Sequence, residues 1–186
     1  MEHLIGTQHP PHRLTDPAET ITVLEAAVPG LLRHRRTAPE PPDWARIEGA
    51  LGLRLPPDFR LLAELYPTFV LAGFLHVPLP APAHESRWLD GVDHELEIVR
   101  DWWEDGSSIG LSPHPAPGGL LPWASSYSGD VFLWTTDEPW RVTVASRNLE
   151  WWHYSGGAVQ FVAEWVSGGL EPWALPELGA AVQVFR

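Results

Sequence analysis

The carboxylates with a spacing that could serve acid–base chemistry are Asp101, Glu104 and Asp105, at the end of a helix that we expect over residues 94–105. Catalysis by two carboxylates requires environments that separate their pKa values, so that one keeps a proton while the other is ionised. Neighbours on one solvated helix end share an environment, and such clusters are usually solvated faces. We therefore assign these three side chains no catalytic role.

Histidines are the next candidates, as metal ligands or proton carriers. His9 and His12 have the spacing of a helical metal pair, but the two prolines between them prevent a helix. We expect His76 in a strand and His114 in a loop. The chain has no cysteine, and it lacks an H-E-x-x-H motif, a P-loop and a G-x-S-x-G elbow that follows a strand. We therefore expect no catalytic site, no metal ion and no cofactor, and predict a binding protein and not an enzyme.

Charge narrows the class of partner. The chain of 186 residues has a formal net charge of −12. A protein that binds nucleic acid needs a cationic surface to displace counterions, so the charge argues against a nucleic acid and suits a basic protein. The alternative is that the negative charge serves solubility alone and selects no partner. No apolar run approaches the ~18 residues that would span a bilayer, and the first residues lack the pattern of a signal peptide, so we expect a cytoplasmic protein without a membrane partner.

Tryptophan is the remaining functional signal, because the chain has 11 of them and exposed Trp is frequent among interface hot spots. Trp44, Trp140 and Trp165 lie on predicted inward faces and are assigned to the core. In the helix over 94–105 we place Trp103 inward, which turns Trp102 outward by about 100°. The residues that we expect to bind a partner are Trp88, Trp102, Glu104, Asp105, Trp123 and Asp130.

The elements that position these residues begin with two short helices whose ends are well marked. In the first, Trp44, Ile47 and Leu51 share one face, and Gly52 follows where a left-handed residue would end the helix. The second repeats this spacing with Phe59, Leu62 and Tyr66; prolines 56 and 57 precede it and proline 67 ends it.

Residues 1–17 read as a mobile tail, because they are polar and broken by prolines. Residues 16–36 have an amphipathic helical pattern that Pro29 and Gly30 should split, and residues 37–42 form a stiff proline-rich linker. We therefore divide the chain into a tail over 1–17, an accessory helix and linker over 18–42, and a main domain over 43–186.

The second half of the chain alternates with the period of an antiparallel meander. Residues 131–135 are apolar on both faces and should form an interior strand. In the next strand Val142 and Val144 alternate with Arg141 and Thr143, which predicts one dry and one wet face. A helix should follow Gly157, and residues 181–185 could add a late strand. The predicted fold is α+β: a twisted, mainly antiparallel sheet flanked by N-terminal helices and by a helix after the sheet.

Three segments carry a resemblance to a known family. They are W-x-x-I-E-x-x-L-G-x-x-L-P-x-D-F from Trp44, G-G-L-L-P-W-A-S-S-Y-S-G-D-V-F-L-W from Gly118, and G-G-A-V-Q-F-V-A-E-W-V-S-G from Gly156. In this order they resemble the SUKH superfamily, which includes bacterial immunity proteins and fungal cell-wall-synthesis regulators. The resemblance implies an immunity protein that binds and neutralises a cognate toxin, and the charge suggests a basic toxin such as a nuclease. The alternative is a regulatory adaptor, as in the fungal branch.

Overall fold

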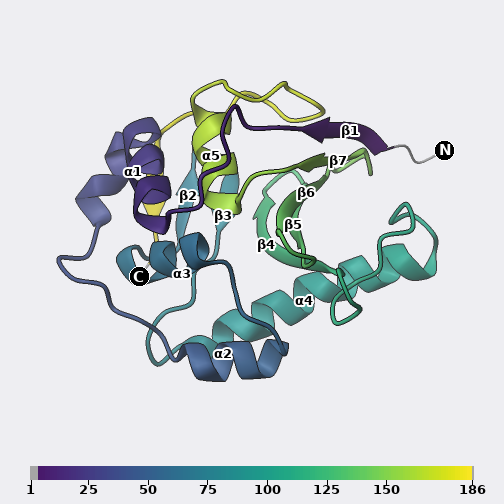
Figure 1. Ribbon diagram of the computed structural model, residues 1–186, viewed down its shortest axis with the longest axis horizontal. Coiled ribbons are helices and arrows are strands. Elements are labelled where there is room, and N and C mark those ends of the chain that lie inside the picture. Colours follow the sequence, from purple (N-terminus) through teal and green to yellow (C-terminus); the bar gives the residue numbers. More distant parts are fainter. Residues whose placement is uncertain (1–3, 186) are drawn as a thin grey trace.

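The computed structural model describes residues 4–185 and has helices on both faces of one sheet (Figure 1). The strands are β1 Leu4–Gln8, β2 Phe69–Leu71, β3 Leu75–Val77, β4 Leu120–Ser126, β5 Val131–Thr135, β6 Arg141–Ala145, β7 Trp151–Tyr154 and β8 Val182–Val184. The helices are α1 Pro17–Ala27, the 3-10 helix η1 Pro29–His34, α2 Trp44–Leu51, α3 Pro57–Leu65, α4 Glu85–Glu104 and α5 Ala158–Val166. The strand order is β1-β7-β6-β5-β4-β3-β2-β8, and only the β1–β7 pair is parallel. The predicted α+β fold is confirmed.

Helices α2 and α3 begin and end where the sequence predicts. The Asp43 side chain accepts a hydrogen bond from the Arg46 amide at 3.0 Å and so caps α2, and Gly52 ends it with a φ of 70°. Pro57 opens α3, and on the face that turns inward Phe59, Leu62 and Tyr66 are buried. The break in the first helix is also confirmed, because α1 stops at Ala27 and η1 starts at Pro29.

The N-terminal segment corrects the predicted tail. Residues 1–3 lie outside the described residues, but Leu4–Gln8 forms β1, which pairs with β7 at one edge of the sheet. The chain after it is also held: Arg13 donates to the Trp140 carbonyl oxygen at 2.6 Å, and Gln160 donates to the His12 carbonyl oxygen at 2.7 Å. A parallel pairing with a strand more than 140 residues away leaves no local pattern, so the prediction missed it.

The sheet is covered on both faces, which corrects the predicted wet face. The larger core lies between the sheet and helices α1, α3 and α5, and it extends to buried side chains of α2 and of the first half of α4. A second cluster, of Val99, Leu120, Val131, Leu133, Ala145 and Trp151, lies on the other face under α4. Trp151 and Trp152 point to opposite faces and both are fully buried, and Thr143, predicted to be wet, is buried as well.

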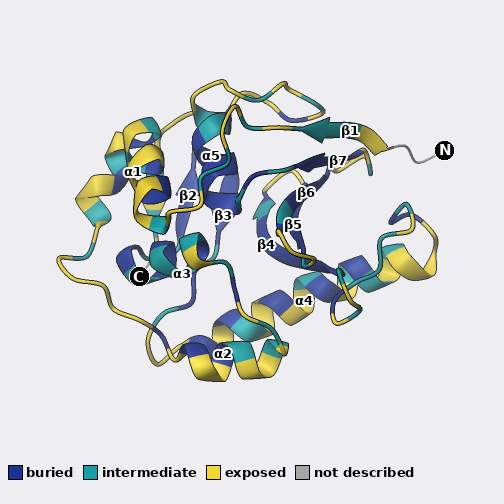
Figure 2. Cartoon of the chain, viewed as in Figure 1, coloured by how far each residue is buried: buried dark blue, intermediate teal, exposed yellow. Residues whose placement is uncertain are grey.

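Helix α4 begins at Glu85, nine residues before the predicted start at residue 94, and replaces part of the loop expected over residues 80–88. Its buried side chains are Glu85, Trp88, Val92, Leu96 and Val99, which form one continuous stripe. Figure 2 shows this buried side facing the rest of the molecule and an exposed side facing outward. Within residues 4–185, no helix combines the length and the apolar character that crossing a membrane requires.

The register of α3 can be tested with two neighbouring leucines. Leu62 is 3% exposed, whereas Leu61 is only partly buried at the edge of the core. We expect Leu62→Ala to lower the free energy of unfolding by about 2–5 kcal/mol, through lost transfer energy and a cavity, and Leu61→Ala to cost clearly less. Urea melts of the two variants measure the difference, and equal losses would contradict this register.

Candidate partner-binding surface

Three of the six residues predicted to bind a partner are buried, and the first is Trp123. It is 2% exposed and packs against Phe132, Trp134 and Phe161, with ring centroids 5.9–6.2 Å apart. The β4–β5 register shifts between Pro122 and Ala124, so an extra residue lies in β4 at this point. The irregularity allows Trp123 to lie in the main core, and this residue is therefore removed from the partner surface.

Trp88 and Asp130 are buried for different reasons. Trp88 belongs to the buried stripe of α4, is 7% exposed, and donates its Nε1–H to the Pro78 carbonyl oxygen at 3.1 Å. Asp130 is 3% exposed; its carboxylate accepts from the Ser126 hydroxyl at 2.5 Å and from the Arg147 amide at 2.9 Å. It thus joins two hairpin turns, and both residues have structural roles.

The Trp102–Trp103 pair has the reverse orientation of the one predicted. Trp102 is partly buried and meets Trp151 edge to face, with ring centroids 5.5 Å apart at 84°. Trp103 is 46% exposed. Either residue could continue the buried stripe, because they follow Val99 by three and four positions. The indole of Trp151 in the second core decides between them, and the candidate interface tryptophan is Trp103.

The exposed side of α4 is acidic from Asp90 to the C-terminal end of the helix. Its exposed carboxylates recur every three or four residues and therefore lie on one face: Asp90, Asp93, Glu97, Asp101 and Glu104. Residues 85–105 contain eight carboxylates and two arginines, a net charge of −6, which is half of the −12 of the chain. We call these five residues with Asp105 and Trp103 the α4 surface; at 20 residues the helix is about 30 Å long.

Two of the predicted binding residues, Glu104 and Asp105, are exposed on this surface beside Trp103. Asp105 accepts hydrogen bonds from the amide of Ser107, at 2.8 Å, and from its hydroxyl, which hold the pKa of the Asp105 carboxyl below its usual value. Arg100 lies 3.2 Å from Asp93 in an exposed ion pair. The surface thus combines a row of exposed carboxylates with one exposed indole.

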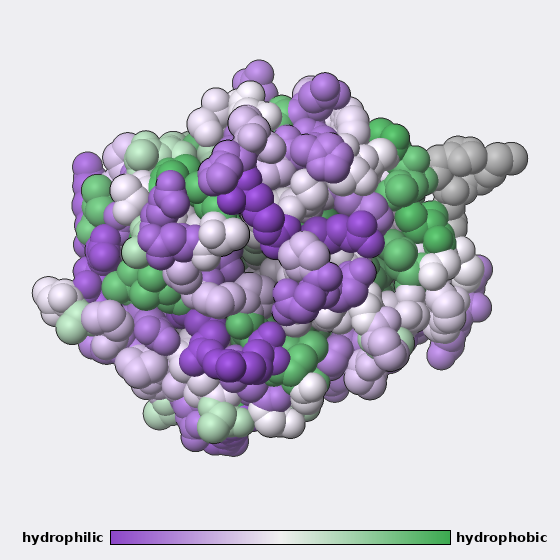
Figure 3. Space-filling view, in the orientation of Figure 1, coloured by the Kyte–Doolittle hydropathy of each residue, from purple (hydrophilic) through white to green (hydrophobic). Residues whose placement is uncertain are grey.

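An apolar patch on another part of the molecule is the competing surface. Figure 3 shows it beside the N-terminal end of the chain, where Leu4 and Ile5 of the edge strand β1 are 45% and 44% exposed. The five residues of β1 carry no charge. An open edge can pair with another strand, but it lacks the charge that would select a basic partner.

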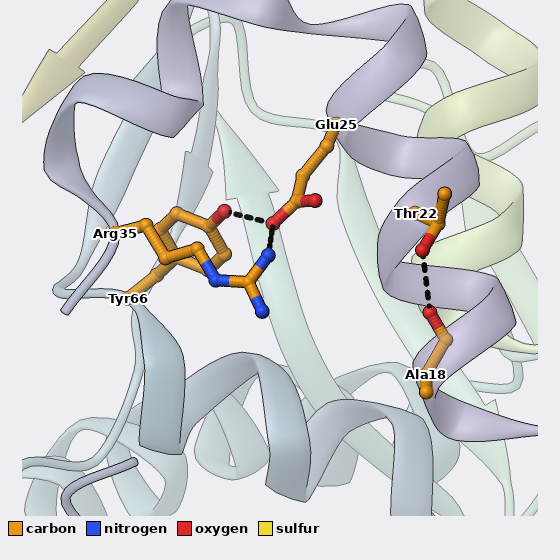
Figure 4. A network of polar contacts seen from close by, with 5 residues as sticks. All are labelled: Ala18, Thr22, Glu25, Arg35 and Tyr66. Atoms are coloured by element: carbon orange, nitrogen blue, oxygen red, sulfur yellow. Dashed lines mark hydrogen bonds and ion pairs between the residues drawn. The ribbon is translucent and has the colours of Figure 1, made fainter. Parts of the chain in front are cut away.

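A polar network at the end of α3 has a structural role. In Figure 4 the Glu25 carboxylate accepts hydrogen bonds from Arg35, at 2.6 Å, and from the hydroxyl of Tyr66, while the Thr22 hydroxyl donates to the Ala18 carbonyl oxygen within the same helix. Burial raises the pKa of Tyr66, and the neighbouring Glu25 acts in the same direction. The network ties α1 and η1 to the end of α3.

The other titratable groups with displaced pKa values do not gather in one site. Burial raises the pKa of the Asp58 carboxyl and of the Tyr154 hydroxyl. Neither group, nor His153, lines the pocket of about 310 Å³ at the C-terminal end of α5. Across residues 4–185, no three His, Asp or Glu side chains are grouped closely enough to hold a metal ion.

The sequence prediction missed Trp103, Asp101 and the three carboxylates of Asp90, Asp93 and Glu97. The signal for the three carboxylates was present: extending the helical spacing of Leu96 back to Val92 and Trp88 starts the helix near residue 85 and aligns the carboxylates opposite. No local signal predicted that Trp103 is exposed, because the contact of Trp102 with Trp151 in β7 decides which of the two tryptophans turns inward. A scan against protein-family models finds no match to the chain, and a search of curated proteins also finds none.

His153 allows a prediction about pH. It is 6% exposed, its Nδ1 lies 2.9 Å from the Thr143 hydroxyl, and burial, aided by the charge of Arg141, lowers its pKa from 6.5 to about 4. Neutral His153 therefore contributes its full stability above pH 6.5, and this contribution is lost as the pH falls towards 4. We expect the unfolding free energy of the wild type to fall more steeply than that of His153→Gln over this range, by up to about 1.4 kcal/mol per pH unit. Urea melts at several pH values measure both slopes, and parallel slopes would contradict the assignment.

Proposed function

We propose that this chain is a non-enzymatic binding protein that neutralises a basic cognate toxin in the cytoplasm, with the α4 surface as its contact. The resemblance to SUKH immunity proteins supports the class, and the anionic surface beside an exposed tryptophan supports the kind of partner. A regulatory adaptor could use the same surface for a housekeeping partner. The two functions differ in whether the partner harms a cell that lacks this protein.

The observation that carries the proposal is the position of charge at the end of α4. The C-terminal end of a helix has a partial negative charge, so carboxylates there are unfavourable and basic residues are favourable. The last turn of α4 contains Asp101 and Glu104 and no basic residue, and Asp105 follows as the C-cap. By contrast, Glu19 lies in the first turn of α1, where a carboxylate stabilises. Carboxylates retained at a cost in stability are expected at functional sites.

Each part of the surface would have its own kinetic role. Exposed charges accelerate encounter, because they attract an oppositely charged protein over a Debye length. A large aromatic side chain that loses its water on binding slows dissociation. The carboxylates of α4 suit the first role and Trp103 suits the second.

These roles predict that one double variant will gain stability but associate more slowly with the toxin. We expect Asp101→Asn with Glu104→Gln to raise the free energy of unfolding by about 0.3–1 kcal/mol per charge, by relieving the helix dipole, and to slow association with the toxin several-fold. Glu19→Gln is the matched control: it should lower stability slightly and leave association unchanged. Urea melts and surface plasmon resonance measure the two quantities.

Trp103 can be tested against its neighbour. Trp103→Ala should leave the fold intact and speed dissociation by an amount equivalent to about 2 kcal/mol, whereas Trp102→Ala should destabilise the fold through the lost contact with Trp151.

The partner to use in these experiments is the product of the neighbouring gene. If that product is harmless to cells, the immunity function is wrong and the regulatory adaptor becomes the proposed function. If folded Trp103→Ala still rescues growth and binds as the wild type does, the α4 surface is not the contact.

A further inference from the structure

The two edges of the sheet differ in how far they are covered. At one edge, the 3-10 helix η1 packs beside β8, where Gly30 lies against Val182. At the other edge, the only strand beside β1 among residues 4–185 is β7. Figure 1 shows β1 along the upper rim of the molecule and α4 at its lower side. The β1 edge is therefore open, and it is separate from the α4 surface.

The start of β1 is apolar, exposed and uncharged. Leu4 and Ile5 stay 45% and 44% exposed although β1 is paired with β7. The five residues of β1 include neither a charged side chain nor a proline, two of the features that keep an edge strand from pairing. Such an edge offers backbone N–H and C=O groups to a further strand, which would also cover the two exposed side chains.

Gly6 places an apolar ring on the same edge. The position that a Gly6 Cβ would take lies 3.1 Å from the Trp173 ring, and this ring is partly exposed. Trp173 donates to the Glu171 carboxylate at 2.9 Å, and the Gln8 side chain bonds to the backbone of Glu171 at 3.0 and 2.9 Å. The ring is thus held beside β1. A projecting Leu4 and a position without a side chain, backed by an indole, lie two residues apart on one strand.

Charge indicates which partner suits this edge. A basic protein is attracted to residues 85–105, which carry half of the net charge of −12, and gains no attraction from an uncharged strand. A second copy of the chain has the same negative charge, so it approaches most easily where the surface carries none. A two-fold dimer also needs a surface that complements itself. Leu4 and Gly6 provide that complementarity.

We propose that β1 pairs with β1 of a second copy about a two-fold axis at Ile5, which joins two sheets into one. In this antiparallel pairing Ile5 lies opposite Ile5 of the second copy, and Leu4 lies opposite Gly6 and packs against Trp173. The exposed leucine and isoleucine of both copies lose water together. The dimer does not depend on the toxin, because it forms at another surface.

Two lysine variants test the edge by sedimentation velocity. The wild type should contain dimer at about 100 µM protein, and Ile5→Lys should weaken dimerisation at least about tenfold, because a charge on an edge strand opposes pairing. Leu32→Lys is the matched control: Leu32 is 50% exposed on η1, and its dimer should persist. Both variants make the chain less negative by one unit and so reduce repulsion between copies. A monomeric wild type, or a dimer that Ile5→Lys leaves unchanged, would overturn the proposal.

Salt distinguishes this dimer from the toxin complex. Raising NaCl from about 0.1 M to about 1 M shortens the Debye length from about 10 Å to about 3 Å. This change should tighten a dimer of like-charged copies and slow the association with a basic toxin. A dimer that salt weakens would contradict an uncharged contact, whereas the α4 surface would be unaffected by that result.

Cross-linking tests the register without adding charge. The chain has no cysteine, so one introduced thiol per copy gives an unambiguous product. Ile5→Cys should form a disulfide-linked dimer under mild oxidation, because opposite residues of an antiparallel pair have Cα atoms about 4.5–5.5 Å apart, within reach of a disulfide. Leu32→Cys should stay monomeric. Absence of the Ile5→Cys product, equal cross-linking of both variants, or the larger oligomers that pairing of β1 with β8 would give, would refute the two-fold pairing.

Discussion

The fold depends on one constraint: successive side chains of a strand point to opposite faces, and here both faces are covered. A sheet with helices on one side only would need polar residues at every second position. In this chain Trp151 and Trp152 are neighbours on β7, and each is fully buried in a different core. Helix α4 contributes to both cores: Val99 and Trp102 cover the second face, whereas Trp88, Val92 and Leu96 belong to the larger core.

The division of α4 into two faces links stability with binding. Val92 and Leu96 are buried in the larger core and Val99 in the second, and Trp102 extends the second contact to Trp151. The opposite face is then free to carry charge without disturbing the core. Trp103 lies about 100° from Trp102 around the helix. The Trp103 side chain is therefore presented to solvent directly beside a residue of the core.

The parts of the fold that the sequence predicts are those with local signals. Proline and glycine mark the ends of α2 and α3 within a few residues, and alternation marks β5 and β6. The parts it does not predict are set by distant contacts: the parallel pairing of β1 with β7, the irregularity at Trp123, and the choice of Trp102 over Trp103 as the inward residue. The same distinction explains the site, where exposed Glu104 and Asp105 could be predicted but the burial of Trp123 and Asp130 could not.

The end of α4 shows why a count of favourable contacts does not identify a functional surface. Asp105 is held by Ser107, so its charge has local support, whereas Asp101 and Glu104 are exposed at the negative end of the helix with no basic residue in that turn. Folding alone would favour lysine or arginine at these two positions. Their charge becomes favourable when a cationic surface approaches, because attraction between the proteins then offsets the repulsion within the helix. The least favourable charges in the helix are, for that reason, the ones that a basic partner would stabilise most.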